Sequence, residues 1–127
     1  MKSKVGLWID HKRAVMVFLT GKREEIREIA SDVEKHVRFS GDQAEDGGAD
    51  DIRDRQFATH LSRYYDEVIA SIRNAESILI FGPGEAKGEL ARRLKDKGLV
   101  QHMVGKESSD KMTDPQIAAR VREHFLA

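Results

Sequence analysis

The chain has 127 residues, 35% charged and 39% hydrophobic, with 22 lysines and arginines balanced by 22 aspartates and glutamates. This length predicts a single domain, residues 1–127, with a core of its own. The zero net charge argues against a protein that covers nucleic acid with a wide basic face, so any RNA contact must be local. The absence of cysteine excludes disulfides, thiolate catalysis and cysteine-ligated zinc.

The start of the chain carries no pattern typical of export. Only three consecutive apolar residues, Leu7–Ile9, precede Asp10, which is too short a run for a signal peptide. No segment approaches the roughly 20 apolar residues that a membrane-spanning helix needs. We therefore expect a cytoplasmic protein with no membrane partner.

The first third of the chain predicts antiparallel strands. Val5–Ile9 and Ala14–Leu19 are short runs rich in β-forming residues, and the polar segment Asp10–Arg13 between them supplies a turn. Glu24–Ala30 is ambiguous, because its isoleucines are also spaced as on a helix face. The neighbouring hairpin favours a third antiparallel strand, and we predict a strand there.

A polar segment separates these strands from the rest of the chain. Ser40–Asp51 contains three glycines and five acidic residues without any apolar period. Such a composition cannot bury enough apolar surface to order the chain, so it predicts a flexible loop at about residues 40–51.

Helices and strands alternate after this loop. Phe57, Leu61, Tyr64 or Tyr65, Val68 and Ile72 share one face of a predicted helix. Thr113 and Gln116 fit a capping box at the start of the last helix. The other predicted elements are a buried strand at Ser77–Phe81, a helix at Glu85–Lys97, a strand at Leu99–Val104 and a last helix burying Ile117, Val121 and Phe125.

The order of these elements, β-β-β-α-β-α-β-α, indicates an α/β fold. The first three strands should form an antiparallel meander, and the strands separated by helices should run parallel with right-handed crossovers. We therefore expect a mixed five-stranded sheet flanked by helices.

The sequence Gly82, Pro83 and Gly84 lies between a strand and a helix, where many proteins hold a phosphate. Pro83 removes one backbone donor, and Glu85 places a carboxylate where the anion would lie. The segment also lacks the spacing of the Walker A and dinucleotide-binding motifs. We interpret it as a structural turn, and only Lys87 favours an anion.

Two further patterns could mark sites. Asp10 ends the first strand, as do metal-binding carboxylates of some nucleases, but an aspartate that stabilises a polar hairpin turn is the stronger interpretation. The five histidines show no metalloprotease spacing, and we expect neither a metal nor a cofactor.

Basic residues flank the acidic loop and could bind a phosphate backbone, or could pair with the loop's own carboxylates. They are Lys35, His36, Arg38, Arg53 and Arg55.

The element order, KHVRFSGDQ at Lys35–Gln43 and ILIFGPGEAKGEL at Ile78–Leu90 together resemble a known domain. That domain is the middle domain of archaeo-eukaryotic peptide chain release factors and of Pelota. The chain looks like a stand-alone bacterial version of it, and the resemblance spans roughly Lys4 to Phe125. The resemblance implies a mixed five-stranded sheet of the translational machinery component type. It also implies a Gly-Pro-Gly turn before a helix that carries a lysine, which matches Gly82–Gly84 and Lys87.

In release factors the loop after the third strand carries Gly-Gly-Gln and triggers hydrolysis of peptidyl-tRNA. The corresponding residues here are Gly41, Asp42 and Gln43. The side chain of Asp42 restricts the backbone and adds negative charge beside RNA, so only Gln43 carries over from the family's hydrolytic motif. Pelota-type members also lack the motif and rescue ribosomes without hydrolysis.

The resemblance therefore implies a non-hydrolytic, translation-related module that binds ribosome, tRNA, a partner protein or another copy of itself. The residues expected to contact phosphate are Lys35, His36, Arg38 and Lys87. An enzyme is the less expected alternative, either a degenerate peptidyl-tRNA hydrolase using Gln43 or a metal-dependent phosphoesterase using Asp10. A protein-interaction domain with no RNA role is the third interpretation, and the neutral charge suits it.

Overall fold

A computed structural model of the chain describes residues 3–31 and 49–126. The predicted contact residues Lys35, His36 and Arg38 lie outside the described residues, as does Gln43. Most of the predicted loop Ser40–Asp51 also lies outside them. Its last three residues belong to a helix that begins at Ala49, so the prediction of a loop through Asp51 was wrong at that end.

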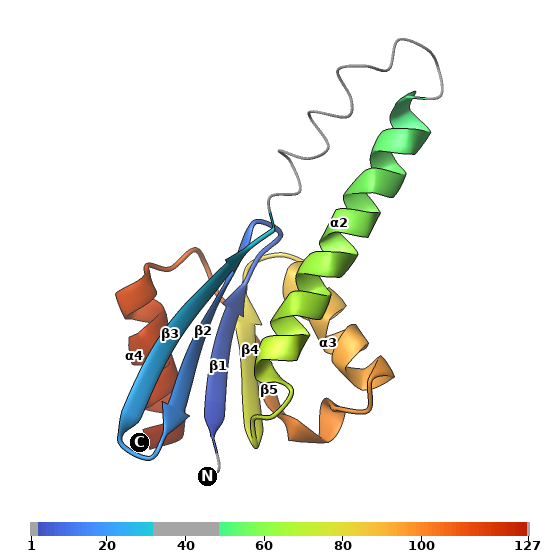
Figure 1. Cartoon of the computed structure of the whole chain (residues 1–127). Coiled ribbons are helices and arrows are strands. Elements are labelled where there is room, and N and C mark those ends of the chain that lie inside the picture. The colour runs from blue at the N-terminus through green and yellow to red at the C-terminus, as the bar shows by residue number, and fades with distance from the viewer. Residues whose placement is uncertain (1–2, 32–48, 127) are drawn as a thin grey trace.

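The chain forms a sheet covered by helices on both faces (Figure 1). Its strands are β1 (Lys4–Ile9), β2 (Arg13–Thr20), β3 (Arg23–Ala30), β4 (Ser77–Gly82) and β5 (Met103–Ser108). Its helices are α2 (Ala49–Ile72), α3 (Ala86–Asp96) and α4 (Asp114–Leu126), with a short 3₁₀ turn η1 (Val100–His102) before β5.

The strand order is β3-β2-β1-β4-β5 in one five-stranded sheet. β1 pairs antiparallel with β2, and β2 with β3, whereas β1–β4 and β4–β5 are parallel. The predicted mixed sheet with an antiparallel meander is thereby confirmed. Helices α2 and α3 cover one face and α4 covers the other (Figure 1).

The central strands are buried on both faces, which explains their nearly continuous apolar sequence. In β1, Leu7 and Ile9 pack toward α2 and α3, while Trp8 packs toward α4. Gly6 lies against α4, where an added Cβ would come within 2.1 Å of a methyl carbon of Val121. Glycine at this position therefore lets α4 approach the sheet closely.

Helix α2 is longer than the sheet is tall, and its first half extends beyond the strand ends (Figure 1). Tyr64, Tyr65 and Val68 are buried as the helical spacing predicts. Phe57 is 37% exposed, which corrects its expected place in the core. Phe57 lies in the first half of α2, which extends beyond the strand ends, so the sheet does not cover its side chain. Among the described residues, no helix is long and apolar enough to cross a membrane.

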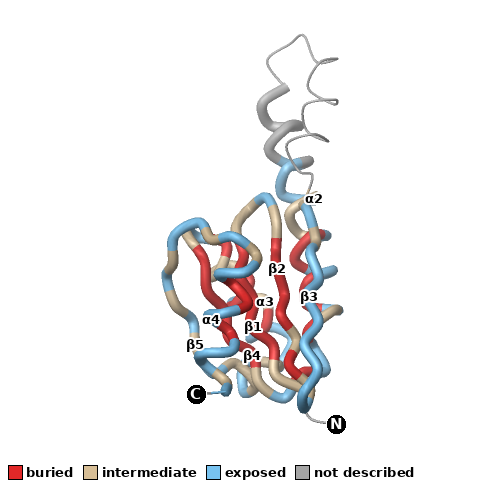
Figure 2. Tube along the Cα trace, turned by 90° about the vertical axis from the view of Figure 1, so that its left-hand side faces the viewer, coloured by how far each residue is buried: buried red, intermediate tan, exposed pale blue. Residues whose placement is uncertain are grey.

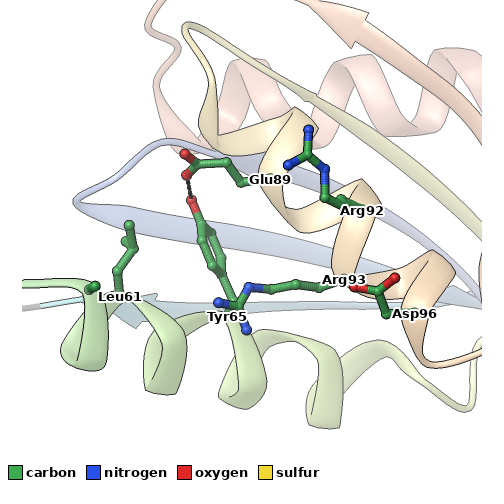
Figure 3. A pocket seen from close by; sticks show the side chains of 7 residues that line it. Leu61, Tyr65, Glu89, Arg92, Arg93 and Asp96 are labelled. Atoms are coloured by element: carbon green, nitrogen blue, oxygen red, sulfur yellow. Dashed lines mark hydrogen bonds between the residues drawn. The ribbon is translucent and has the colours of Figure 1, made fainter. Parts of the chain in front are cut away.

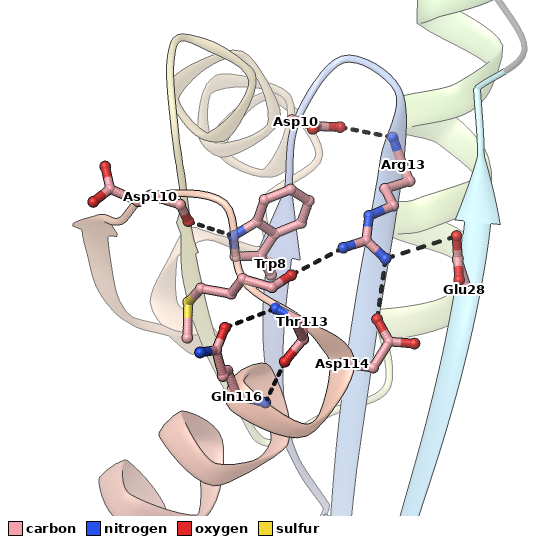
Figure 4. Close-up of polar contacts among 9 residues, drawn as sticks. Trp8, Asp10, Arg13, Glu28, Asp110, Thr113, Asp114 and Gln116 are labelled. Atoms are coloured by element: carbon pink, nitrogen blue, oxygen red, sulfur yellow. Dashed lines mark hydrogen bonds and ion pairs between the residues drawn. The ribbon is translucent and has the colours of Figure 1, made fainter.

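Helix α4 begins at the predicted capping box. The Thr113 backbone N–H donates to Gln116 Oε1 over 2.9 Å, and the Gln116 N–H lies 3.4 Å from Thr113 Oγ1 (Figure 4). These two contacts satisfy amide groups that have no partner inside the helix. The capping prediction is confirmed.

The predicted strand at Leu99–Val104 was wrong in position, because β5 runs from Met103 to Ser108. Leu99 belongs instead to the end of α3. Its N–H donates to Leu94 O over 2.8 Å, just after Gly98 at φ +74°, which is the usual closure of a helix by a glycine in the left-handed region. The chain then makes η1, and only afterwards the largely polar edge strand β5.

Candidate anion-binding site

The Gly82–Gly84 turn lies against the end of β1. Gly82 has φ +152°, and an added Cβ would lie 2.2 Å from the backbone oxygen of Ile9. Gly84 has φ +67°, in the left-handed region, with open space around its missing side chain. Gly82 O also accepts a hydrogen bond from Ser109 N over 3.1 Å. The geometry thus requires a glycine at both positions, for different reasons.

Lys87 lies in the first turn of α3, directly after this turn. Its Nζ donates to Gly84 O over 2.6 Å. The ammonium group has two further protons, and no carboxylate partner for it is found in the described part of the chain. Lys87 is therefore held over the turn while retaining its uncompensated charge.

Lys87 borders a shallow hollow of about 540 Å³, which we name the cationic hollow. Its lining residues are Gly84, Glu85, Lys87, Gly88, Glu89, Arg92 and Lys106. Within residues 3–31 and 49–126, neither Arg92 nor Lys106 has a hydrogen-bond or ion-pair partner. Three cations that form no ion pair within the described residues thus border one concave surface at the carboxyl ends of the parallel strands, together with the carboxylates of Glu85 and Glu89.

Pairing between strands brings Lys106 to this place. Lys106 of β5 lies opposite Ile80 of β4, whose side chain faces α2 and α3. Lys106 therefore projects on the same side of the sheet as α3. Gly88, in the same helix as Lys87, has nothing within 4 Å of where its Cβ would be, so packing does not require glycine there. Its missing side chain leaves the floor of the cationic hollow bare.

Glu89 is engaged elsewhere and does not neutralise the three cations directly. Its Oε1 accepts a hydrogen bond from the Tyr65 hydroxyl and lies 2.9 Å from His11 Nε2. Figure 3 shows Tyr65 of α2 reaching to Glu89 on α3, with Arg92 and Arg93 beside them. Glu89 and Arg92 also border a second hollow of about 410 Å³ between α2 and α3. The cluster ties the β1–β2 turn, α2 and α3 together at the edge of the cationic hollow.

This cluster alters the acidity of its members. Burial raises the pKa of Tyr65, and the hydrogen bond to Glu89 raises that pKa further. Burial alone would raise the pKa of Glu89, but the hydrogen bonds from Tyr65 and His11 and the charge of Arg93 outweigh it. The pKa of Glu89 is consequently held below its ordinary value, and Glu89 stays ionised.

The lowered pKa of Glu89 predicts a pH dependence of stability. A carboxyl group with a depressed pKa in the folded state contributes stability above its unfolded pKa and loses it as pH falls through the folded pKa. Wild type should therefore unfold at higher urea concentration than Glu89→Gln at pH 7, and this difference should shrink below about pH 4. Urea titrations at a series of pH values measure it. Glu67→Gln, an exposed glutamate on α2, is the control, and an advantage over Glu89→Gln that persists unchanged to about pH 3 would contradict the prediction.

Asp10 serves the hairpin turn. Its Oδ1 accepts hydrogen bonds from the backbone N–H groups of Lys12 and Arg13, each over 2.8 Å, and Figure 4 shows the contact with Arg13. The N–H of Asp10 donates to Arg13 O over 3.0 Å. The described residues contain no group of three histidine or acidic side chains that could hold a metal. These contacts favour the interpretation of Asp10 as a turn residue.

The structure places one predicted contact residue, Lys87, in the cationic hollow. Ser31, the last described residue before the segment with the other three, donates its Oγ–H to His11 O over 2.7 Å. His11 in turn contacts Glu89, so Ser31 lies at the same end of the sheet as the hollow. Arg92 and Lys106 were not among the residues predicted to contact phosphate. Arg92 lies in the C-terminal half of α3, where a basic residue is expected because it interacts favourably with the helix dipole, so its presence indicates no ligand. Lys106 lies beyond the end of the predicted strand, so its position in the sheet was not predicted.

No protein-family model matches the sequence, and no curated protein matches it. Among solved structures, the Pelota protein of Thermoplasma acidophilum matches 98% of this chain with a TM-score of 0.60 and 14% identity. Pelota of Archaeoglobus fulgidus matches 98% of the chain with the same TM-score and identity. The chain shares its fold with part of archaeal Pelota.

The chain spans 40% of the first Pelota protein and 32% of the second. A structure of an archaeal translation termination factor also matches, over 98% of this chain and 40% of the other, with 14% identity and a TM-score of 0.48. A TM-score of that size is too low to support a fold assignment. At 14% identity, the two Pelota matches establish the fold and leave the activity to the site itself.

Proposed function

We propose that this protein is a non-hydrolytic, translation-related module that contacts the RNA backbone of ribosome or tRNA through the cationic hollow. The observation that carries the proposal is the convergence of Lys87, Arg92 and Lys106, none of them in an ion pair within the described residues, on one concave surface. Glu85 and Glu89 line the same surface, so the three positive charges exceed the negative charges there by one. Lysine and arginine side chains of this kind bind phosphate oxygens and position a protein on nucleic acid. The Pelota-like fold supports the connection with translation.

The neutral net charge of the chain is compatible with this function because the contact is local. Three phosphate contacts give weak, salt-sensitive binding rather than the tight binding of a broadly basic protein. Lys35, His36 and Arg38 would add contacts from the segment that follows Ser31, which lies next to the His11 backbone. We further propose that Gln43 supports no hydrolysis, because Asp42 places a side chain and a negative charge where the family has glycine.

Cosedimentation with ribosomes tests the binding. Wild-type protein should pellet with ribosomes at low salt and be released at high salt, since salt competes for phosphate contacts. Charge reversal at Lys35 and Arg38 should weaken the association, whereas Gln43→Ala should leave it unchanged. An association that persists at high salt would contradict a phosphate-based contact.

Release of labelled peptide from a stalled ribosome complex tests the absence of hydrolysis. Wild type should release no more peptide than buffer alone. Peptide release by wild type that disappears in Gln43→Ala would overturn the non-hydrolytic proposal and favour the degenerate hydrolase. A protein that neither releases peptide nor pellets with ribosomes at low salt would be assigned to protein interaction instead.

A further inference from the structure

The outer edge of β3 is open to solvent. β3 is the terminal strand of the sheet, and seven of its eight residues are exposed while the other is half-buried. Figure 2 shows it as an exposed strand along one border of the molecule. The buried core side chains come from β1, β2, β4 and the helices. A strand edge of this kind presents backbone N–H and C=O groups to any strand that can pair with it.

The register of β3 shows which backbone groups point outward. Ser31 N donates to Lys12 O over 2.9 Å and continues the β2–β3 ladder by one residue. Odd-numbered residues of β3 therefore direct their backbone groups toward β2. It follows that Glu24, Ile26 and Glu28 direct theirs away from the sheet.

We propose that a second copy of this chain pairs antiparallel along this edge, with the two-fold axis at Ile26. In that register Ile26 lies opposite Ile26 of the second copy. Glu25 lies opposite Arg27 of the second copy, and Arg27 opposite its Glu25. Glu24 lies opposite Glu28, and the outward backbone groups of the even-numbered residues form the ladder. Two five-stranded sheets then join into one continuous sheet.

Charge disfavours the two neighbouring registers. Glu25 and Arg27 are neighbours on one face of β3, with Arg27 Nε 2.9 Å from Glu25 Oε1, and both remain more than half exposed. Each therefore can also meet the opposite charge of the second copy. Moving the axis to residue 25 or 27 places like charges opposite one another, which destabilises a pair of strands. A parallel pairing of the two β3 strands in register would also place like charges next to one another along the edge.

Each glutamate on the other face lies near an arginine of its own chain, although Arg13 is closer to Asp114, at 3.0 Å, than to Glu28. Glu24 Oε1 lies 2.7 Å from Arg122 Nη1, and Glu28 Oε1 lies 4.0 Å from Arg13 Nη1 (Figure 4). The opposition of Glu24 and Glu28 across the interface is therefore moderated by two arginines. Ile26, 44% exposed in the single chain, provides an apolar contact at the axis.

Charges on an edge strand normally prevent aggregation, and here they permit one defined pairing. Eight residues make a small interface, so we expect a dimer that forms reversibly with rising concentration. The edge lies across the sheet from β5 and Lys106, and pairing leaves the cationic hollow accessible. The experiments on dimerisation and on RNA binding therefore test two separate surfaces, and either proposal can be contradicted while the other holds.

Two single charge reversals and their mixture test the register. Glu25→Arg places two arginines opposite two arginines, and Arg27→Glu places two glutamates opposite two glutamates. Each variant alone should have a dimer dissociation constant raised at least about tenfold over wild type in sedimentation equilibrium.

Mixed in equal amounts, the two variants should form a heterodimer. The arginine introduced at position 25 of one chain then faces the glutamate introduced at position 27 of the other. The native Arg27 of the first chain likewise faces the native Glu25 of the second. The double variant Glu25→Arg/Arg27→Glu should dimerise with itself, because it exchanges both charges at once.

Lys95→Glu, on the exposed surface of α3 away from this edge, is the control and should dimerise as wild type does. Hydrogen exchange of the wild-type chain provides a test that needs no variant. The Ile26 N–H should gain protection between about 10 μM and about 1 mM protein, while the Arg27 N–H, bonded to β2, should not change. Wild type that remains monomeric over this range would overturn the proposal. A mixture of the two reversals that stays monomeric would overturn it as well.

Discussion

Gly82→Ala should reduce the free energy of unfolding by roughly 3 to 5 kcal/mol, since the new Cβ meets backbone and the φ angle is unfavourable for alanine. The Cβ would lie 2.2 Å from the carbonyl oxygen of Ile9, an atom fixed in the central strand β1. Neither β1 nor β4 can move aside, because both are buried on both faces. With φ at +152°, the alanine would be strained even if space were made.

Gly84→Ala is the matched control for this prediction. Gly84 has φ +67° but nothing within 4 Å of its Cβ position, so alanine should cost only about 1 to 2 kcal/mol of backbone strain. Urea unfolding of both variants measures the difference. Equal losses of stability would mean that the contact with Ile9 O relaxes and that backbone conformation alone explains both glycines.

Most of the fold could be predicted because local chemistry and packing agree in it. Asp10 turns the first hairpin through its own carboxylate, and the apolar runs on either side are central strands. The error at Leu99 has a physical cause. An apolar residue after Gly98 can begin a strand or close a helix, and here Leu99 packs against the core while its N–H caps α3. Only the hydrogen bonding at the end of α3 in the structure shows that Leu99 closes a helix and does not begin a strand.

The candidate site was less predictable than the fold. Lys87 stood out because it follows the Gly82–Gly84 turn along the chain. Lys106 reaches the hollow only through its pairing with Ile80 in a parallel ladder, which contains an irregularity between Ile78 and Leu79. One residue of difference in that register would turn Lys106 to the α4 face. Sequence spacing does not specify such a register, so the convergence of the three cations required the structure.

Replacing Lys87, Arg92 and Lys106 together by glutamine should abolish most of the salt-dependent RNA binding that we propose. For single-stranded nucleic acid, each neutralised phosphate contributes about 0.7 to the slope of the logarithm of affinity against that of salt concentration. Three lost contacts should therefore lower this slope by about 2. Between about 50 and about 200 mM salt, wild type should lose roughly 15- to 20-fold more affinity than the variant. Fluorescence anisotropy with a single-stranded oligouridylate measures both slopes.

A second triple variant separates the cationic hollow from a general loss of positive charge. Lys22, Arg73 and Lys95 are exposed. They belong to the β2–β3 turn, the turn that follows α2 and the second half of α3, and none of them lines the cationic hollow. Their replacement by glutamine changes the net charge by the same amount as the first triple variant. If binding depends on the hollow, this control should retain the wild-type salt slope. Equal slopes for the two triple variants would show that net charge, and not the convergence of Lys87, Arg92 and Lys106, governs the contact with RNA.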